Sequence, residues 1–503
     1  MSLLLILNIN SYSIKGISTF DFCYIIDLGG DVRELSGKDG ISIGEAHTVF
    51  GLGAMVGIAI MFLVKSKDKL NEKCQIKYIH PCDIRATRIE KFEWLTNAQS
   101  FSQIAFETII PDKHSNWINQ SDNDFNELLP LIEKKNKDVL FKLSSLGIST
   151  NRDSWVIDIS KTDLLNKAKF LSETYNSSVV KNVLDERIKW SRDLNSKLER
   201  KLKSKFDKNK ITNIDFRPYS KYYYYSEKLF SDVLTQNHFD MFGENLSNDN
   251  KIICVVIEPQ IPFVALSTKS IINMHYGGRQ TQIFAQYQYD QAGNRHDNIT
   301  DWGLSQFVNH YAPTLSKFKT LTEFPNEITK EAIFYYTYAV LHNPAYRSKY
   351  ELNLKREFPR LPFYDDFFTW AAWGKQLMDL HIDYETVAPY DLQVVDNSNI
   401  KDKNYKLKVK LKADKAQGII AIDEHTHILG VPETAWQYKL GNRSALEWVL
   451  DQYKEKKYTD KTIAENFNTY RFADYKPQVI DLLKRVCTVS VETMKIIEAM
   501  KQA

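Results

Sequence analysis

Closely spaced cysteines are missing from this sequence of 503 residues. Zinc sites and redox motifs need cysteines only a few residues apart, so the sequence argues against both and indicates no metal site. An odd, scattered set of thiols is typical of a reducing compartment, and we expect a cytoplasmic protein. The five cysteines are Cys23, Cys74, Cys82, Cys254 and Cys487.

Secretion signals and long apolar runs are also scarce. Leu3–Leu7 is too short for a signal peptide, and no basic residue precedes it. Val49–Val64 holds sixteen uncharged residues with three glycines, whereas a membrane-spanning helix needs about 20 apolar residues. We interpret the segment as a buried strand with its preceding turn, and expect no membrane contact. The alternative is a membrane-anchored interaction protein.

Motifs for cofactor binding and catalysis are incomplete or missing. Gly51 and Gly53 suggest two such motifs, but a dinucleotide fingerprint needs glycine in place of Val56. The Phe-x-Gly-x-Gly element of methyltransferases needs phenylalanine in place of Val49. Neither Asn-Pro-Pro-Tyr nor Asp-Pro-Pro-Tyr, which grip a flipped adenine, occurs, and no Walker phosphate loop is present. The sequence therefore indicates no catalytic and no cofactor-binding residue in this chain.

The composition is that of an ordinary globular protein, with 43% hydrophobic, 26% charged and 13% aromatic residues. The length predicts several domains. A net charge of +3 permits contact with a polyanion without arguing for one, so a basic surface has to be local. Apolar runs at 22–28, 58–64 and 75–79 predict strands at the edge of an α/β sheet.

The remaining chain predicts one large mixed α+β unit after a connector. Residues 85–141 are typical of a connector with short helices, and residues 164–210 favour a pair of long helices. Beyond them we expect short strands over 216–289, helices over 304–387, a charged strand pair over 406–428, and helices from 444 to the end.

Positive charge is concentrated in the second of those predicted helices, residues 187–210. Ten Lys and Arg stand there against three acids, a local charge of +7. Such a segment either binds phosphates or forms an ordinary solvated face. An aromatic and basic cluster follows with Arg217, Tyr219, Lys221 and Tyr222–Tyr225, which suits contacts with nucleic acid or the filling of a strand.

Nine motifs in a fixed order carry a family resemblance over nearly the whole chain. The chain resembles the C-terminal half of type ISP restriction-modification enzymes and related adenine-specific DNA methyltransferases. The motifs lie at Ile26–Glu34, His47–Lys65, Ser115–Phe125, Gly147–Val156, Phe216–Glu227, Ile333–Tyr350, Phe358–Phe363, Leu380–Glu385 and Gly430–Tyr453.

The resemblance implies three regions and a function. Residues 1–90 would be the last strands of a Rossmann-like methyltransferase sheet, 91–160 a connector, and 161–503 a mixed α+β target recognition domain for double-stranded DNA. The methyltransferase of the full-length family, with its S-adenosylmethionine site, would precede this chain, which we expect to be truncated upstream. In the alternative, a separate methyltransferase or restriction chain completes a functional enzyme.

Candidate residues follow from the basic segment, the motifs and the recognition domain that the resemblance implies. The candidate DNA-binding residues are Arg187, Lys189, Arg192, Arg200, Lys201, Lys203, Arg217, Tyr219, Arg279, Arg347 and Arg443. A further motif, Arg152, Asp153 and Trp155, is a candidate for DNA contact through Arg152 or for a structural role. For Arg152 and Arg347 the structural role is favoured, because aromatic or carboxylate neighbours would lock a turn.

Overall fold

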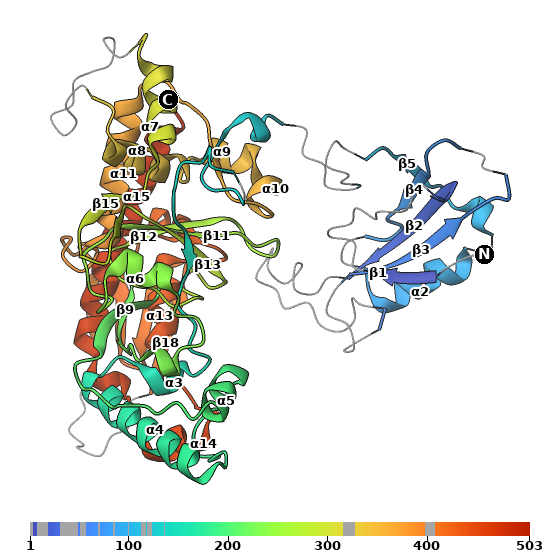
Figure 1. Cartoon of the computed structure of the whole chain (residues 1–503). Coiled ribbons are helices and arrows are strands. Elements are labelled where there is room, and N and C mark those ends of the chain that lie inside the picture. Colours follow the sequence, from blue (N-terminus) through green and yellow to red (C-terminus); the bar gives the residue numbers. More distant parts are fainter. Residues whose placement is uncertain are drawn as a thin grey trace. The chain divides into compact units, whose positions relative to one another are not determined.

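A computed structural model describes most of the chain, which divides into two compact units (Figure 1). Unit 1 comprises Met1–Asn123 and Pro259–Ile261, and unit 2 comprises Asp124–Glu258 and Pro262–Ala503. The described residues are 4–7, 19–30, 49–50, 57–68, 71–83, 86–98, 100–111, 117, 123–134, 136–314, 327–397 and 408–502. The glycines at 51 and 53 and most of the motif at 115–125 lie outside them.

Unit 1 is built on a five-stranded mixed sheet. Strand β2 (Phe22–Gly29) pairs in parallel with β4 (Gln75–Ile79) and antiparallel with β3 (Ile58–Val64), and the outer strands are both antiparallel to their neighbours. The three strands predicted from the apolar runs are confirmed, with β3 and β4 at the predicted bounds. The order across the sheet is β1 (Leu4–Leu7), β3 (Ile58–Val64), β2 (Phe22–Gly29), β4 (Gln75–Ile79) and β5 (Glu107–Ile109).

Alternation along β2 buries both faces of this sheet. Cys23 and Ile25 join an apolar cluster on one face, while Ile26 and Leu28 join another that includes Trp94 of helix α2 (Arg88–Asn97). Strand β3 occupies the end of the uncharged segment that raised the membrane alternative. Within the described residues, no helix is both long and apolar enough to cross a membrane.

Several small sheets form the frame of unit 2. All pairings within them are antiparallel. The larger sheets have the orders β12 (Val264–Thr268), β11 (Ile252–Val256), β13 (Thr281–Ala285), β7 (Ser145–Leu146); β8 (Ile157–Asp158), β10 (Ser220–Tyr225), β9 (Ile211–Arg217); and β17 (Gln393–Asp396), β20 (Thr426–Leu429), β19 (Ile419–Asp423), β18 (Val409–Asp414). The two-stranded sheets pair β14 (Tyr287–Tyr289) with β15 (Arg295–Asp297), β16 (Arg360–Leu361) with β6 (Leu129–Pro130), and β21 (Lys439–Leu440) with β22 (Arg443–Ser444).

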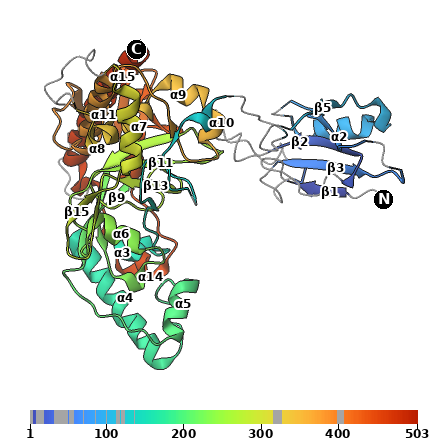
Figure 2. The ribbon, with the colours of Figure 1, turned by 45° about the horizontal axis from the view of Figure 1, so that its top comes forward.

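Helices of unit 2 cover these sheets, and the main apolar core lies where they meet. In Figures 1 and 2, α8 (Lys330–Val340), α11 (Phe367–Ile382) and α15 (Lys476–Met500) run side by side. Gly374 of α11 allows the closest approach, because a Cβ there would lie 1.8 Å from the carbonyl oxygen of Tyr335 in α8. The helices are α3 (Asp153–Val156), α4 (Lys161–Lys181), α5 (Arg192–Glu199), α6 (Gln236–Phe242), α7 (Asp301–Tyr311), α8 (Lys330–Val340), α9 (Pro344–Lys349), α10 (Glu351–Leu354), α11 (Phe367–Ile382), α12 (Glu433–Gln437), α13 (Ala445–Gln452), α14 (Lys461–Asn466) and α15 (Lys476–Met500).

The predicted mixed fold with a helical C-terminal part is confirmed in this coarse form, but the predicted pair of long helices is wrong in its second member. Helix α4 spans 21 residues, whereas α5 spans only eight. Ser191 caps the start of α5, and Lys201 just beyond its end has a φ of 54°, in the left-handed region that stops a helix. Only Leu194 and Leu198 of α5 are buried, so little packing favours a longer helix.

Candidate nucleic-acid interface

Most basic residues of segment 187–210 lie on the surface of unit 2, whereas Lys197 donates to backbone carbonyls of residues 228–231. Arg187 is clamped by Asp185, with its Nη2 2.7 Å from the carboxylate, and its guanidinium lies 5.6 Å from the ring of Phe170. The other predicted members reach solvent from α5 and the loops beside it. The predicted residues that are exposed here are Arg187, Lys189, Arg192, Arg200, Lys201 and Lys203.

A second basic site centres on Arg217 at the end of β9. Its guanidinium lies 4.2 Å from the ring centroid of Phe216, and its Nη1 donates to the Oδ1 of Asn273 at 2.8 Å. Asn273 in turn donates from Nδ2 to Asp153 at 3.2 Å. The side chain is half-buried, and this removal from water lowers the pKa of Arg217 from its ordinary value. The contacts hold the guanidinium in one orientation.

The loop between β12 and β13 brings further basic side chains to Arg217. The backbone N–H of His275 donates to the Oδ1 of Asn273 at 3.0 Å, the same oxygen that accepts from Arg217. His275 and Arg279 are exposed. Partial loss of water lowers the pKa of His275, and the positive charges of Arg217 and Arg279 lower it further. These three side chains therefore share one positive field.

Trp448 packs against the same loop and lies beside a further arginine, Arg443. A Cβ on Gly278 would lie 3.0 Å from the Cη2 of the indole, so the loop rests directly on the ring. The guanidinium of Arg443 lies 5.0 Å from the Trp448 ring, at the spacing of a cation–π contact. Arg443 also forms an ion pair with Asp451 at 3.0 Å.

Lys456 completes the group, with its ammonium 5.9 Å from the ring of Phe216. We call these five residues the basic cluster: Arg217, His275, Arg279, Arg443 and Lys456. The structure thus brings together three of the predicted DNA-binding arginines, which lie up to 226 residues apart in the sequence.

Arg152 has a structural environment. It is fully buried and contacts Asp232, with 3.1 Å between Nη1 and Oδ1. It also donates to the carbonyl of Phe230 at 2.5 Å and to the Oγ of Ser191 at 2.6 Å. Trp155 is buried too and donates from Nε1 to Asp460 at 2.8 Å. These side chains join loops that are distant in the sequence.

Two members of the predicted DNA-binding set are turned away from solvent to different degrees: Tyr219 is enclosed, and Arg347 has the structural environment that was favoured for it. Tyr219 is 3% exposed and donates to the hydroxyl of Tyr438 at 3.3 Å, so it offers no surface to DNA. Arg347 is turned to the carbonyl of Leu341, to which its Nε donates at 2.6 Å. Burial lowers the pKa of Arg347 to about 10. Tyr219 therefore packs in the interior, whereas Arg347 is half-buried, with its guanidinium 5.6 Å from the ring of Phe263.

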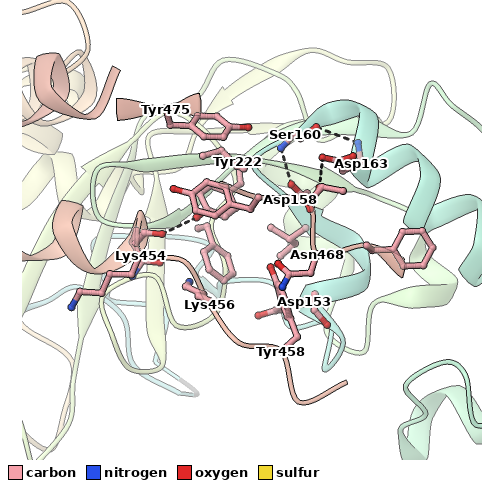
Figure 3. Close-up of a pocket in the computed structure, with 18 of the residues that line it drawn as sticks. Asp153, Asp158, Ser160, Asp163, Tyr222, Lys454, Lys456, Tyr458, Asn468 and Tyr475 are labelled. Carbon is pink, nitrogen blue, oxygen red and sulfur yellow. Dashed lines mark hydrogen bonds between the residues drawn. The ribbon is translucent and has the colours of Figure 1, made fainter. Parts of the chain in front are cut away.

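A cavity of about 280 Å³ lies beside the basic cluster and was not predicted (Figure 3). Phe216 and Lys456 line the cavity. Lys456 is also a member of the basic cluster, and the ring of Phe216 lies near both Arg217 and Lys456. Figure 3 shows Lys454 and Lys456 on one side, and Asp158, Ser160 and Asp163 on the other. Its walls come from segments near 155, 220 and 455–475, so no local pattern in the sequence indicated it.

The fold and the basic cluster define a mixed α/β domain with a preorganised cationic surface. Residues 139–482 match the family described as the type ISP C-terminal specificity domain. The match spans most of the chain, and the chain belongs to this family. None of the curated proteins compared with the chain matches it.

Solved structures give the same assignment. The cryo-EM structure of the DrdV–DNA complex is 38% identical, with a TM-score of 0.82 over 95% of this chain and 48% of that one. A nuclease-deletion mutant of the type ISP restriction-modification enzyme LlaGI, in complex with a DNA substrate mimic, is 28% identical, with a TM-score of 0.78 over 96% and 44%. The ATP-dependent type ISP restriction-modification enzyme LlaBIII, bound to DNA, is 25% identical, with a TM-score of 0.80 over 96% and 31%. The chain spans less than half the length of each.

Proposed function

We propose that this chain is the sequence-specific recognition module of a cytoplasmic restriction-modification adenine-N6 DNA methyltransferase that takes part in phage defence. Its partner is double-stranded DNA. The observation that carries the proposal is the basic cluster, in a chain whose family is a specificity domain and whose structural neighbours were solved with DNA.

The geometry of the cluster suits the reading of bases. Arginine reads guanine by two parallel hydrogen bonds to O6 and N7 in the major groove, which needs a guanidinium of fixed orientation. Phe216 and Asn273 fix the orientation of the Arg217 guanidinium, and Trp448 supports the orientation of the Arg443 guanidinium. Lys456 and the exposed residues of segment 187–210 would contact phosphates, which position the protein on the duplex.

Methyl transfer belongs to residues outside this chain in our proposal. S-adenosylmethionine is the cofactor expected for the full-length family, and we assign no described residue of unit 1 to its site. Asp27, at the carboxyl end of the parallel strands β2 and β4, already accepts from the Gly29 N–H at 2.9 Å and from the Tyr78 hydroxyl at 2.8 Å. Its carboxylate also faces His80 at 3.7 Å. We assign no methyl-transfer step to this chain.

Unit 1 supports the methyltransferase part of the proposal by its sheet. A mixed sheet with a parallel pair flanked by antiparallel strands, covered by a helix, is the expected closing part of a Rossmann-like methyltransferase sheet. A separate methyltransferase or restriction chain is then a candidate partner. Labelled S-adenosylmethionine and DNA, with and without added relatives of the N-terminal half, would reveal such completion as methyl incorporation.

Salt-dependent duplex binding tests the proposal. Fluorescence anisotropy with a labelled duplex of about 40 base pairs would give the dissociation constant between about 50 and 200 mM salt. A protein that neutralises several phosphates loses affinity steeply over this range, with a slope of about −0.9 per phosphate in the logarithmic plot. Affinity that does not change with salt would contradict the proposed function.

A further inference from the structure

We infer that the cavity shown in Figure 3 is a receptor for a single nucleobase that carries an exocyclic amino group. The inference rests on the proposed function, because it makes DNA the nearest source of such a base. It goes beyond that function by assigning a binding site away from the base edges in the groove.

Aromatic rings supply the walls of the cavity. Phe216 and Tyr222 are stacked, with ring centroids 5.1 Å apart and planes at 19°, and Tyr470 and Tyr475 are stacked with centroids 5.2 Å apart and planes at 26°. All four rings are half-buried and line the cavity, so each keeps ring surface for a further contact. Stacking on aromatic side chains is the usual way in which proteins hold an unpaired base.

One side chain of the cavity, Gln452, has a hydrogen-bond acceptor that lacks a donor in the described part of the chain. Gln452 lines the cavity and is 6% exposed, and its Oε1, which has almost no accessible surface, lacks a hydrogen-bond partner among the described residues, so a turn of the amide would present it to a ligand. An amide oxygen accepts, so the group that would satisfy it is an N–H or O–H. An unpaired buried acceptor is costly, and a bound ligand that donates to it would remove that cost.

The carboxylates on the opposite side strengthen this preference. Asp158 and Asp163 line the cavity and are held in place, Asp158 by Lys167 and the Ser160 N–H, and Asp163 by the Thr469 hydroxyl at 2.9 Å. Carboxylates accept from amino groups and repel phosphate. Adenine, cytosine and guanine carry an exocyclic amino group, whereas thymine does not.

The size and location of the cavity fit one base beside bound DNA. Its volume of about 280 Å³ is just below the ~300–1,000 Å³ of sites for drug-sized ligands, so it suits a single ring system. Lys456 of the basic cluster lines the cavity, and so does Phe216, whose ring lies near Arg217 and Lys456. A base that leaves a duplex bound at the cluster is therefore near the cavity, while the exposed Lys454 and Lys456 suit its phosphates.

Binding of free nucleosides to the full chain provides the first test. Saturation-transfer NMR would measure the affinities of adenosine, cytidine, guanosine and thymidine. We expect binding of the first three and at least about tenfold weaker binding of thymidine, which lacks the amino group. Gln452→Leu and Tyr475→Ala should each weaken adenosine binding by about tenfold. Tyr289→Ala, which alters a half-buried tyrosine outside the cavity, is the matched control and should leave it unchanged.

A bulged duplex provides the second test and identifies the source of the base. One duplex carries a single unpaired 2-aminopurine, which keeps an amino group and is quenched by stacking, and a second carries the same base paired. We expect quenching of the bulged base by the wild-type chain, and at least about tenfold less affinity for that duplex in Gln452→Leu or Tyr475→Ala. Circular dichroism would show that each variant is folded.

The outcomes separate this inference from the proposed function. Nucleoside binding without quenching in the bulge supports the cavity as a site for free nucleotides, and quenching supports a base from DNA. The inference is overturned if folded protein binds neither, or if thymidine binds as tightly as adenosine. Salt-dependent binding of the paired duplex would still uphold DNA recognition in that case.

Discussion

Arg152 provides the sharpest test of the structural role of its motif. In Arg152→Ala, the carboxylate of Asp232, the carbonyl of Phe230 and the hydroxyl of Ser191 are each deprived of a donor. All of these hydrogen bonds are buried or partly buried, so water cannot replace the guanidinium freely. The variant therefore leaves a charge and two polar groups without this donor in the interior of unit 2.

The expected magnitude is that of removing one partner from a buried ion pair, which costs ~3–5 kcal/mol. The lower end applies here, because Asp232 keeps a hydrogen bond from Asn151 at 2.6 Å and is 10% exposed. We expect Arg152→Ala to reduce the free energy of unfolding by about 3 kcal/mol. Because the buried guanidinium does not touch DNA in this account, we expect DNA affinity to change little while the protein remains folded.

Urea unfolding followed by tryptophan fluorescence measures this destabilisation, since Trp155 and Trp190 lie in the same region. The matched control is Arg187→Ala, which removes an exposed arginine of unit 2 and its ion pair with Asp185. The control should change stability little. The reasoning is refuted if Arg152→Ala destabilises the protein no more than the control does.

Three further predictions concern packing, pH and DNA. Gly374→Ala should reduce the free energy of unfolding by ~1–3 kcal/mol in urea titrations, because the new Cβ would lie 1.8 Å from a carbonyl oxygen of α8; unchanged stability would mean that these helices do not approach so closely. Burial lowers the pKa of His381 to about 3, below its unfolded value of about 6.5, so its contribution to stability is present above about pH 6.5 and disappears as pH falls toward 3. Unfolding at about pH 7 and pH 5 should show this decrease, and His381→Gln should make it smaller, with His342 and His238, whose pKa values are also lowered by burial, accounting for part of the remainder; equal pH dependence in both proteins would contradict the assignment. The double variant Arg279→Ala, Arg443→Ala should reduce the salt slope of duplex binding by about 1 for each arginine that binds a phosphate, and should relax the sequence preference for each arginine that reads a base. Anisotropy with several duplexes would measure both effects. An unchanged affinity, slope and preference would show that these residues are not part of the interface.

Local patterns predicted the strands well. Ile58–Val64 and Gln75–Ile79 are strands at the bounds that their apolar runs indicate, because strand length and burial leave a direct mark on the sequence. Helix α5 was predicted too long, since a basic segment with few apolar positions gives no reliable helical period. Its true end depends on the backbone at Lys201, which a charge pattern does not reveal.

Several residues of the site could be selected from the sequence, but their proximity in space could not be predicted. Arg217 and Arg443 were selected from motifs and Arg279 from the expected recognition domain, yet only the fold shows that Phe216 and Trp448 support two of them. Only the fold shows that His275 lies in the field of Arg217 and Arg279. Tyr219 stands among similar tyrosines in the sequence, and its burial follows from tertiary packing. The cavity draws on three distant segments, and the unsatisfied oxygen of Gln452 becomes visible only with its neighbours in place.

Selection from a randomised duplex library tests sequence-specific recognition most directly. The full chain would be incubated with the library at physiological salt, and the bound duplexes would be sequenced after several rounds. We expect enrichment of one short site, which fades when Arg217, Arg279 and Arg443 are replaced together by alanine. Salt-sensitive binding with no enriched site, or an enriched site that survives the triple replacement, would contradict it.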